Sequence, residues 1–204
     1  MARQILVTGF APFGGERSNP SWEVAQRLDG TEISGATVKA IRLPVNCARA
    51  ARIVAEAIEE LRPAAVLGLG QAGGRPALSI EKVAINVADG RVSREIDGGV
   101  NGKPVIGGGP DAYFTRLPVA LILSAIKRRG IPAGLSLTAG VYVCNSVMYA
   151  ALHALRRRSK VPSGFIHLPY AADQAVRHRA AASMSTAMMT DGISLALEVI
   201  ARRL

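Results

Sequence analysis

The sequence is poor in aromatic residues, cysteines and acidic side chains. Aromatic residues make up 4% of its 204 residues and are not interleaved with the basic clusters, so the stacking side chains typical of nucleic-acid binding are missing. There are only two cysteines, and no charged segment followed by an apolar one opens the chain, which excludes a secreted disulfide scaffold. We therefore expect a cytoplasmic protein with reduced thiols.

Long hydrophobic runs are also missing. Pro, Gly or a charged residue interrupts every apolar stretch well before the roughly 18 residues that a membrane span needs. The net charge of +10 owes much to two clusters, 127–129 and 156–158, each followed within a few residues by Gly or Pro. Cations at helix C-termini give this pattern, so we expect a soluble protein with no membrane and no nucleic-acid partner.

Ala, Val, Leu, Ile and Gly are abundant instead, and 49% of the residues are hydrophobic. This composition and the length favour one domain, 1–204, with a buried sheet. Apolar runs alternate with amphipathic segments, which predicts a three-layer α/β/α fold with a mostly parallel twisted central sheet. We expect strands over 4–10, 37–45, 64–70, 78–87, 134–143 and 164–168. We expect helices starting near 19 and 145 and spanning 48–61, 115–129 and 192–204, with a long surface excursion over 88–111.

Cys144 is the first candidate for chemistry. The sequence places it at the end of a strand, with a helix beginning directly after it. The positive end of a helix lowers the pKa of a thiol, and its free N–H groups can stabilise an oxyanion. The alternative is a small buried hydrophobic residue, which is also how we interpret Cys47, in the first turn of another helix.

His167 is the candidate base, because it interrupts an apolar strand just before the chain enters a loop. The alternative is a core histidine bonded to a backbone carbonyl. His153 and His178 lie in basic or polar stretches, and we interpret both as surface residues.

A third group must orient the imidazole of a Cys–His pair, and Glu81 is the best candidate. It falls in the apolar run 78–87, where an acid is rarely buried unless it is paired. An outward-facing carboxylate or an ion pair with Lys82 would explain Glu81 equally well.

Metal and nucleotide chemistry lack support in the sequence. The Cys and His residues show no close ligand spacing, so we predict no metal site. Residues 68–73 match G-x-G-x-x-G after a strand, but the following Gly-Arg-Pro breaks the chain where a dinucleotide fold would open a helix. We therefore predict no cofactor.

Several long segments resemble the pyrrolidone-carboxylate peptidases (pyroglutamyl peptidase I), which are cysteine peptidases of an α/β/α fold. In chain order the segments are VTGFAPFGGERSNPSWEVA from Val7, GLGQAGGR from Gly68, EKVAINVADGR from Glu81, GGPDAYFTRLP from Gly108, TAGVYVCNSVMYAAL from Thr138 and GFIHLPY from Gly164. The resemblance implies a catalytic triad of Glu81, Cys144 and His167, which agrees with the choice made from the residues themselves.

The same resemblance implies a function and a set of substrate contacts. The substrates would be peptides with an N-terminal pyroglutamate, cleaved through an acyl-enzyme, and the protein would be a homo-oligomer, either a dimer or a tetramer. Phe10 and Phe13 would flank the pyroglutamyl ring, with Tyr142 at a position often aromatic or apolar. Gln71 would hydrogen-bond the lactam, and Arg91 and Val92 would lie on a loop beside the site.

Overall fold

A seven-stranded sheet forms the middle of the molecule. The computed structural model describes residues 3–88 and 102–204. Across the sheet the strands follow the order β2-β3-β1-β4-β9-β5-β8. They are β1 (Arg3–Phe10), β2 (Glu32–Ile33), β3 (Ala36–Leu43), β4 (Ala65–Gln71), β5 (Leu78–Glu81), β8 (Ala133–Ser136) and β9 (Ser163–Leu168).

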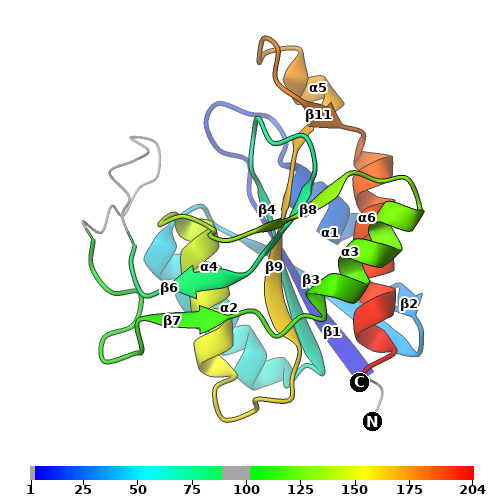
Figure 1. Cartoon of the computed structure of the whole chain (residues 1–204). Helices are drawn as coiled ribbons and strands as arrows, with labels where there is room; N and C mark the ends of the chain where they lie inside the picture. Colours follow the sequence, from blue (N-terminus) through cyan, green and yellow to red (C-terminus); the bar gives the residue numbers. More distant parts are fainter. Residues whose placement is uncertain (1–2, 89–101) are drawn as a thin grey trace.

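Most neighbouring strands run parallel, from β3 through β1 and β4 to β9. The pair β5–β8 is parallel within itself, but β5 is antiparallel to β9, and β2 is antiparallel to β3. Helices cover both faces, which confirms the predicted three-layer fold (Figure 1). Helices α1 (Pro20–Leu28), α3 (Val119–Arg128) and α6 (Thr186–Ala201) pack on one face, and α2 (Cys47–Leu61) and α4 (Val143–Ala154) on the other.

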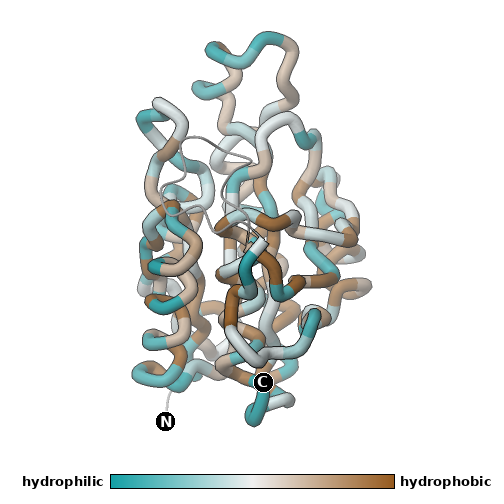
Figure 2. Tube along the Cα trace, turned by 90° about the vertical axis from the view of Figure 1, so that its left-hand side faces the viewer, coloured by the Kyte–Doolittle hydropathy of each residue, from teal (hydrophilic) through white to brown (hydrophobic). Residues whose placement is uncertain are grey.

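The pattern of side chains explains why these helices form and where they dock. Asn19 and Asn46 cap α1 and α2 through their side-chain oxygens, which accept hydrogen bonds from the first turn. In α2, Val54 and Ile58 are fully buried at a spacing of one turn, and each contributes about 1.5–3 kcal/mol by burial. Hydrophobic positions accordingly run through the body in Figure 2, while hydrophilic positions gather at the turns above and below.

Two short excursions leave the central sheet. Strands β6 (Val83–Ile85) and β7 (Ala112–Phe114) pair with each other. Strands β10 (Tyr170–Ala171) and β11 (Ser183–Met184) pair in parallel, and with α5 (Ala172–Ala175) they form the projection at the top of Figure 1. We call residues 170–184 the upper projection.

The strand predicted over 78–87 is wrong as a single strand. It breaks at Lys82, because 83–85 turn away to pair with β7 in a separate sheet. The strand predicted over 134–143 also ends early, at Ser136. A turn with Gly140 at φ 75° interrupts it, a conformation that glycine adopts without strain.

Three helix boundaries also differ from prediction. Helix α4 ends at Ala154, so the basic residues 156–158 lie after the helix and not in its last turn. Helix α3 starts four residues later than expected, behind Pro118. Helix α6 starts at Thr186, where Ser185 caps it with its side chain, and not at Gly192.

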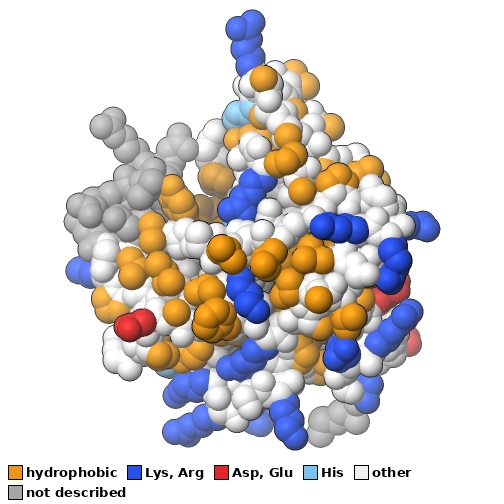
Figure 3. All heavy atoms as spheres, viewed as in Figure 1, with side chains coloured by type: hydrophobic (Ala, Val, Ile, Leu, Met, Phe, Trp, Pro, Cys, Tyr) orange, Lys and Arg blue, Asp and Glu red, His pale blue; other side chains and the backbone are white. Residues whose placement is uncertain are grey.

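Surface features bear on two of the partner predictions. Within 3–88 and 102–204, no helix is long and apolar enough to cross a membrane. Figure 3 shows Lys and Arg side chains spread along the lower and right-hand edges, without a single dense basic area on this face. Hydrophobic side chains cross the middle of the same face.

Candidate active site

A cavity of about 420 Å³ opens where the parallel strands β1, β4 and β9 end. The carboxyl ends of parallel strands are where α/β proteins commonly bind ligands. Five stretches of chain build its walls, from the end of β1, the loop after β3, the end of β4, the segment that leads into α4 and the end of β9. The cavity is lined by Phe10, Phe13, Asn19, Val45, Gln71, Ala72, Gly73, Arg75, Thr138, Ala139, Gly140, Tyr142, Val143, Cys144, His167 and Tyr170.

His167 and Glu81 form a buried pair at the floor of this cavity. The His167 Nδ1 atom lies 2.7 Å from Glu81 Oε1, and Glu81 is fully buried. An ionised carboxylate only accepts hydrogen bonds, so Nδ1 carries the proton and Nε2 of a neutral ring is left as an acceptor. Both predicted alternatives for Glu81, an outward carboxylate and an ion pair with Lys82, are wrong.

Arg75 completes this cluster. Its Nη1 atom lies 2.8 Å from the same oxygen, Glu81 Oε1, and its half-exposed side chain also lines the cavity. Analysis of the sequence gave Arg75 no role, because only the fold brings the β4–β5 loop over Glu81. Arg75 gives the buried carboxylate a permanent counter-charge.

Cys144 lies on the same face of the sheet as His167. Gly70 is opposite His167 in the parallel pair β4–β9, and a Cβ atom on Gly70 would lie 2.8 Å from Cys144 Sγ. Opposed residues of neighbouring strands point to one face, and the strands are about 4.8 Å apart. The thiol therefore rests on Gly70, one strand away from the imidazole. The structure records no direct hydrogen bond between Cys144 and His167, both of which it describes.

The start of α4 differs slightly from prediction. Cys144 is the second residue of the helix and does not end a strand, because β8 has already stopped at Ser136. No side chain caps this helix, so its first N–H groups have no acceptor within the helix. Asn145 anchors the same turn to β6: its Oδ1 accepts from Ile85 N–H, and its Nδ2 donates to the carbonyls of Ile85 and Val87.

The pKa shifts in the site follow from burial and from its charges. Burial raises the pKa of Cys144 to about 12, helped by the charge of Glu81, so the predicted lowering by the helix is wrong for this structure. Burial also lowers the pKa of His167, against the opposing effect of Glu81. For Glu81, burial alone would raise the pKa, but His167, Ser136 and Arg75 outweigh it and lower the pKa. At neutral pH the thiol and the imidazole are thus both uncharged.

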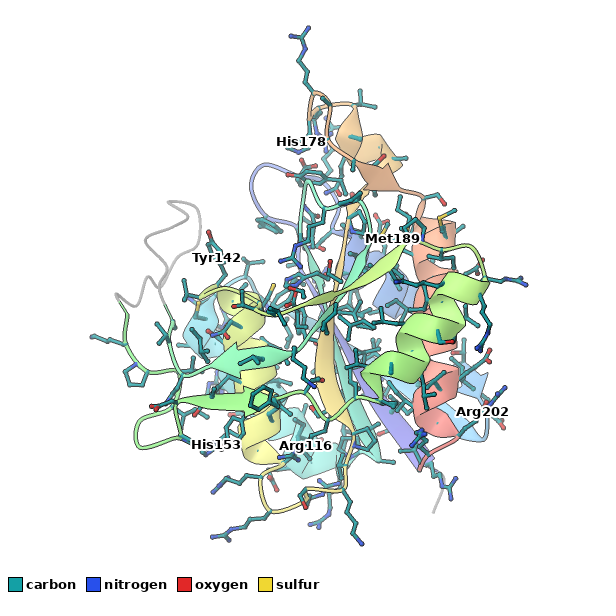
Figure 4. The ribbon with its side chains drawn as sticks, viewed as in Figure 1. Arg116, Tyr142, His153, His178, Met189 and Arg202 are labelled. Carbon is teal, nitrogen blue, oxygen red and sulfur yellow. The ribbon has the colours of Figure 1, made fainter. Side chains whose placement is uncertain are left out.

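Aromatic side chains supply much of the remaining wall. Phe10 is almost fully buried against Phe165, with ring centroids 6.4 Å apart. Phe13 is half-buried and Tyr142 is exposed at the rim. Figure 4 shows Tyr142 above the start of α4, with His178 on the upper projection at the same end of the molecule. The cavity thus offers an apolar slot beside the thiol.

The predicted substrate residues fall into two groups. Phe10, Phe13, Gln71 and Tyr142 line the cavity together with Cys144 and His167. Arg91 and Val92 lie outside the described residues, so their positions stay a prediction.

The structure also shows the surroundings of the second cysteine and of the two other histidines. Cys47 is buried at the start of α2, as expected for a small hydrophobic residue. His153 and His178 are partly exposed, in keeping with their interpretation as surface residues, but both have side-chain partners. His153 Nδ1 lies 2.9 Å from the Tyr113 hydroxyl, while His178 Nε2 lies 2.7 Å from Glu16 Oε1 and its ring stacks on Tyr170.

The glycine motif at 68–73 has a packing role here. Gly68 lies against Phe165 and Gly70 against Cys144, and the chain continues from Gly73 towards strand β5 without an intervening helix. Among the described residues, no group of three or more His, Cys, Asp or Glu side chains is placed to hold a metal ion.

The comparisons with known proteins agree with this geometry. A family profile described as pyroglutamyl peptidase matches residues 3–203. The pyrrolidone-carboxylate peptidase of Klebsiella pneumoniae (strain 342) is 46% identical over 199 residues, covering 98% of this chain and 93% of the relative. That of Yersinia pestis (strain Pestoides F) is 45% identical over 198 residues, covering 97% and 92%.

Solved structures show the same likeness. Pyroglutamyl peptidase I from Bacillus amyloliquefaciens superposes with a TM-score of 0.92 at 37% identity, covering 98% of this chain and 96% of its own. A mutant pyrrolidone carboxyl peptidase from the hyperthermophile Pyrococcus furiosus gives a TM-score of 0.91 at 38% identity, covering 98% and 99%.

Proposed function

The chain belongs to the pyroglutamyl peptidase family of cysteine-type hydrolases, and on that premise we propose that it removes N-terminal pyroglutamyl residues from peptides. Cys144 is the proposed nucleophile, His167 the base and Glu81 the group that orients the base. The observation that carries the proposal is the buried His167–Glu81 hydrogen bond of 2.7 Å in the floor of the cavity that Cys144 also lines.

The proposed reaction starts from an uncharged pair. His167 accepts the thiol proton at Nε2 while Cys144 Sγ attacks the carbonyl that joins pyroglutamate to the next residue. Because burial raises the pKa of the thiol to about 12, proton transfer accompanies the attack and no stable thiolate precedes it. The distance between the two groups shortens as substrate enters, as in other enzymes whose catalytic hydrogen bonds tighten on binding.

Two charges develop during the proposed reaction, one on the imidazole and one on the substrate oxygen, and each has its own stabilising group. The new imidazolium is stabilised by Glu81, which stays ionised because its pKa is lowered. The oxyanion is stabilised by free N–H groups at the start of α4, where losing one such donor typically costs about 3 kcal/mol of barrier. His167 then returns the proton to the leaving amine, and water hydrolyses the thioester.

The lining of the cavity supports selectivity for a blocked N-terminus. Pyroglutamate is an uncharged lactam, which suits a slot formed by Phe10, Phe13 and Tyr142. An ordinary N-terminal ammonium would lose its hydration there without gaining a carboxylate partner. Among the described residues, no Asp or Glu lines the cavity, and Glu81 behind it is fully buried and already paired. We therefore expect peptides with free N-termini to be rejected.

One assay tests reaction, nucleophile and selectivity together. Wild type should release a fluorophore from its pyroglutamyl conjugate and leave the alanyl conjugate intact, while Cys144→Ala should be inactive on both. Cys47→Ala, which removes the other buried thiol outside the cavity, should keep the activity. Equal hydrolysis of both conjugates, or an active Cys144→Ala protein, would refute the proposal.

Two further parts of the proposal concern location, which rests on the sequence, and assembly, which rests on the family. We place the enzyme in the cytoplasm, where its thiols stay reduced, and we expect a dimer or tetramer. Cell fractionation tests the first. Light scattering tests the second, since a particle of one 21.4 kDa chain would contradict it.

A further inference from the structure

Gln174 is a fully buried amide in an otherwise exposed and charged part of the upper projection. Its side chain makes three hydrogen bonds. Oε1 accepts from Ala171 N–H at 3.0 Å, while Nε2 donates to the Ser18 carbonyl at 3.2 Å and to Gln71 Oε1 at 3.0 Å. These partners lie up to 156 residues away, so one side chain joins three of the segments around the cavity.

Two backbone groups fix the orientation of the Gln174 amide. The Ala171 N–H can only donate and the Ser18 carbonyl can only accept, so exchanging the oxygen and nitrogen of Gln174 would oppose like groups at both. A buried polar group left without a partner is strongly disfavoured. Nε2 of Gln174 is therefore the atom that faces Gln71.

This orientation determines how Gln71 presents its own amide. A donor at Gln174 requires an acceptor opposite it, so Gln71 directs Oε1 at Gln174, which is not among the residues that line the cavity. The planar amide then directs Nε2, with two N–H groups, to the other side. The cavity receives a hydrogen-bond donor, which suits the carbonyl oxygen of a lactam.

We propose that Gln174 is a positioning residue that sets substrate specificity by holding the Gln71 amide with its donor towards the ligand. The inference rests on the proposed function and deepens it. Gln174 touches no substrate and acts only through Gln71. Through this contact the site recognises the lactam carbonyl by a hydrogen bond, in addition to the apolar surface of the ring.

Gln174→Glu is the sharpest test, because it replaces only the amide nitrogen by an oxygen and so turns the hydrogen-bond donor that faces Gln71 into an acceptor. The carboxylate still accepts from Ala171 N–H but can donate neither to Gln71 nor to the Ser18 carbonyl, so both contacts of Nε2 are lost. Gln71 then rotates its N–H groups towards the new carboxylate and turns Oε1 into the cavity. We expect the KM for a pyroglutamyl-linked fluorophore to rise about tenfold to hundredfold, with kcat changed far less, because ground-state and transition-state binding are lost together.

Gln174→Met provides a second variant that introduces no charge. It removes the donor while keeping the volume, so we expect a smaller KM rise of about threefold to tenfold. Competitive inhibition by the lactam 2-pyrrolidinone should weaken in the same order, most in Gln174→Glu and less in Gln174→Met. Alkylation of Cys144 by iodoacetamide should proceed at the wild-type rate in both variants, because it does not depend on lactam recognition.

A double-mutant cycle separates positioning from a general structural role. In a Gln71→Leu background, Gln174→Glu should raise KM by less than about twofold, since the residue through which it acts is already missing. Gln26→Glu makes the same chemical change at an exposed residue of α1 and should match wild type.

Each outcome decides the question. If the KM of Gln174→Glu stays within twofold of wild type, or rises equally with and without Gln71, the inference is overturned while the peptidase proposal stands. If wild type itself does not cleave the pyroglutamyl substrate, the proposed function fails first, and the inhibitor series no longer concerns an active site.

Discussion

Arg75 and His167 share one oxygen of Glu81, at 2.8 Å and 2.7 Å respectively. This arrangement explains how an acid can stay ionised without any exposure to solvent. It also limits how strongly Glu81 attracts a proton to His167, because the positive charge of Arg75 lowers the pKa of that imidazole. Arg75 therefore acts on the base through the carboxylate.

Replacing Arg75 should move the pH dependence of catalysis. In the proposed mechanism His167 acts as base only when neutral, so activity should fall as the pH drops through the pKa of His167, which burial holds below its ordinary value of 6.5. In Arg75→Gln the lowering effect of Arg75 is lost, the pKa rises, and the acid limb of kcat/KM moves to higher pH. We expect activity near pH 6 to fall about threefold to tenfold, since one pKa unit corresponds to a factor of about ten.

The matched control is Arg27→Gln, which removes an exposed arginine from α1. Its acid limb should coincide with that of wild type. A profile for Arg75→Gln that falls uniformly at all pH values, with no displacement of the limb, would show that Arg75 serves only to hold the loop.

Single residues were predictable from sequence when their chemistry was unusual for their surroundings. Cys144, His167 and Glu81 each interrupt an apolar segment. In the structure His167 is hydrogen-bonded to Glu81, and His167 and Cys144 line one cavity. Arg75 and Gln174 gave no such signal, because an arginine among glycines and a glutamine in a polar stretch resemble ordinary surface residues. Their partners are distant in sequence or across the sheet, so only the fold reveals them.

At the scale of elements, the site depends on how closely α4 approaches β4. Gly70 provides the room: a Cβ there would lie 2.8 Å from Cys144 Sγ and from two atoms of the Phe165 ring. The helix start and the strand end can be this close only because position 70 has no side chain. One methyl group would force the thiol away from His167.

Gly70→Ala should therefore be inactive or nearly so, and overpacking should destabilise the fold by about 1–3 kcal/mol in urea unfolding. Gly134→Ala is the control, because Gly134 also lies in a strand of the sheet but a Cβ there would meet nothing within 4 Å. Full activity in Gly70→Ala would show that α4 can move outward without consequence for catalysis.

The elements themselves were largely predictable because strands and helices alternate with clear apolar patterns. The two strand errors lie where the chain leaves the central sheet. An apolar run spans 78–87, but the antiparallel pairing of β6 with β7 takes its second half out of the central sheet. Similarly, the run 134–143 is apolar because its second half forms the cavity wall and the helix start, and not because it continues a strand.

At the scale of the whole molecule, the buried groups predict a pH window of greatest stability. Burial lowers the pKa of His167 below 6.5, so the unfolded chain takes up a proton first and stability declines as the pH falls below that value. Glu81 acts in the same direction at lower pH, because its folded pKa is also lowered. Cys144 has a folded pKa of about 12 against an ordinary 9.0, so the unfolded chain ionises first and stability declines above pH 9.

The urea midpoint should accordingly be highest between about pH 6.5 and pH 9. Each fully buried group contributes a slope of about 1.4 kcal/mol per pH unit outside that window. Cys144→Ala should flatten part of the alkaline decline, and the buried Cys47, whose pKa burial also raises, should account for another part. An alkaline limb identical in wild type and Cys144→Ala would contradict this account.

The place of β9 in the sheet has a consequence for synthesis. This strand is made late, at 163–168, yet it lies between β4 and β5, which end at Gln71 and Glu81, and it carries His167. A chain still emerging from the ribosome before that point has two open sheet edges and a thiol without its base. On the proposed mechanism, the newly made chain therefore gains its peptidase activity only after β9 has been made and has joined the sheet.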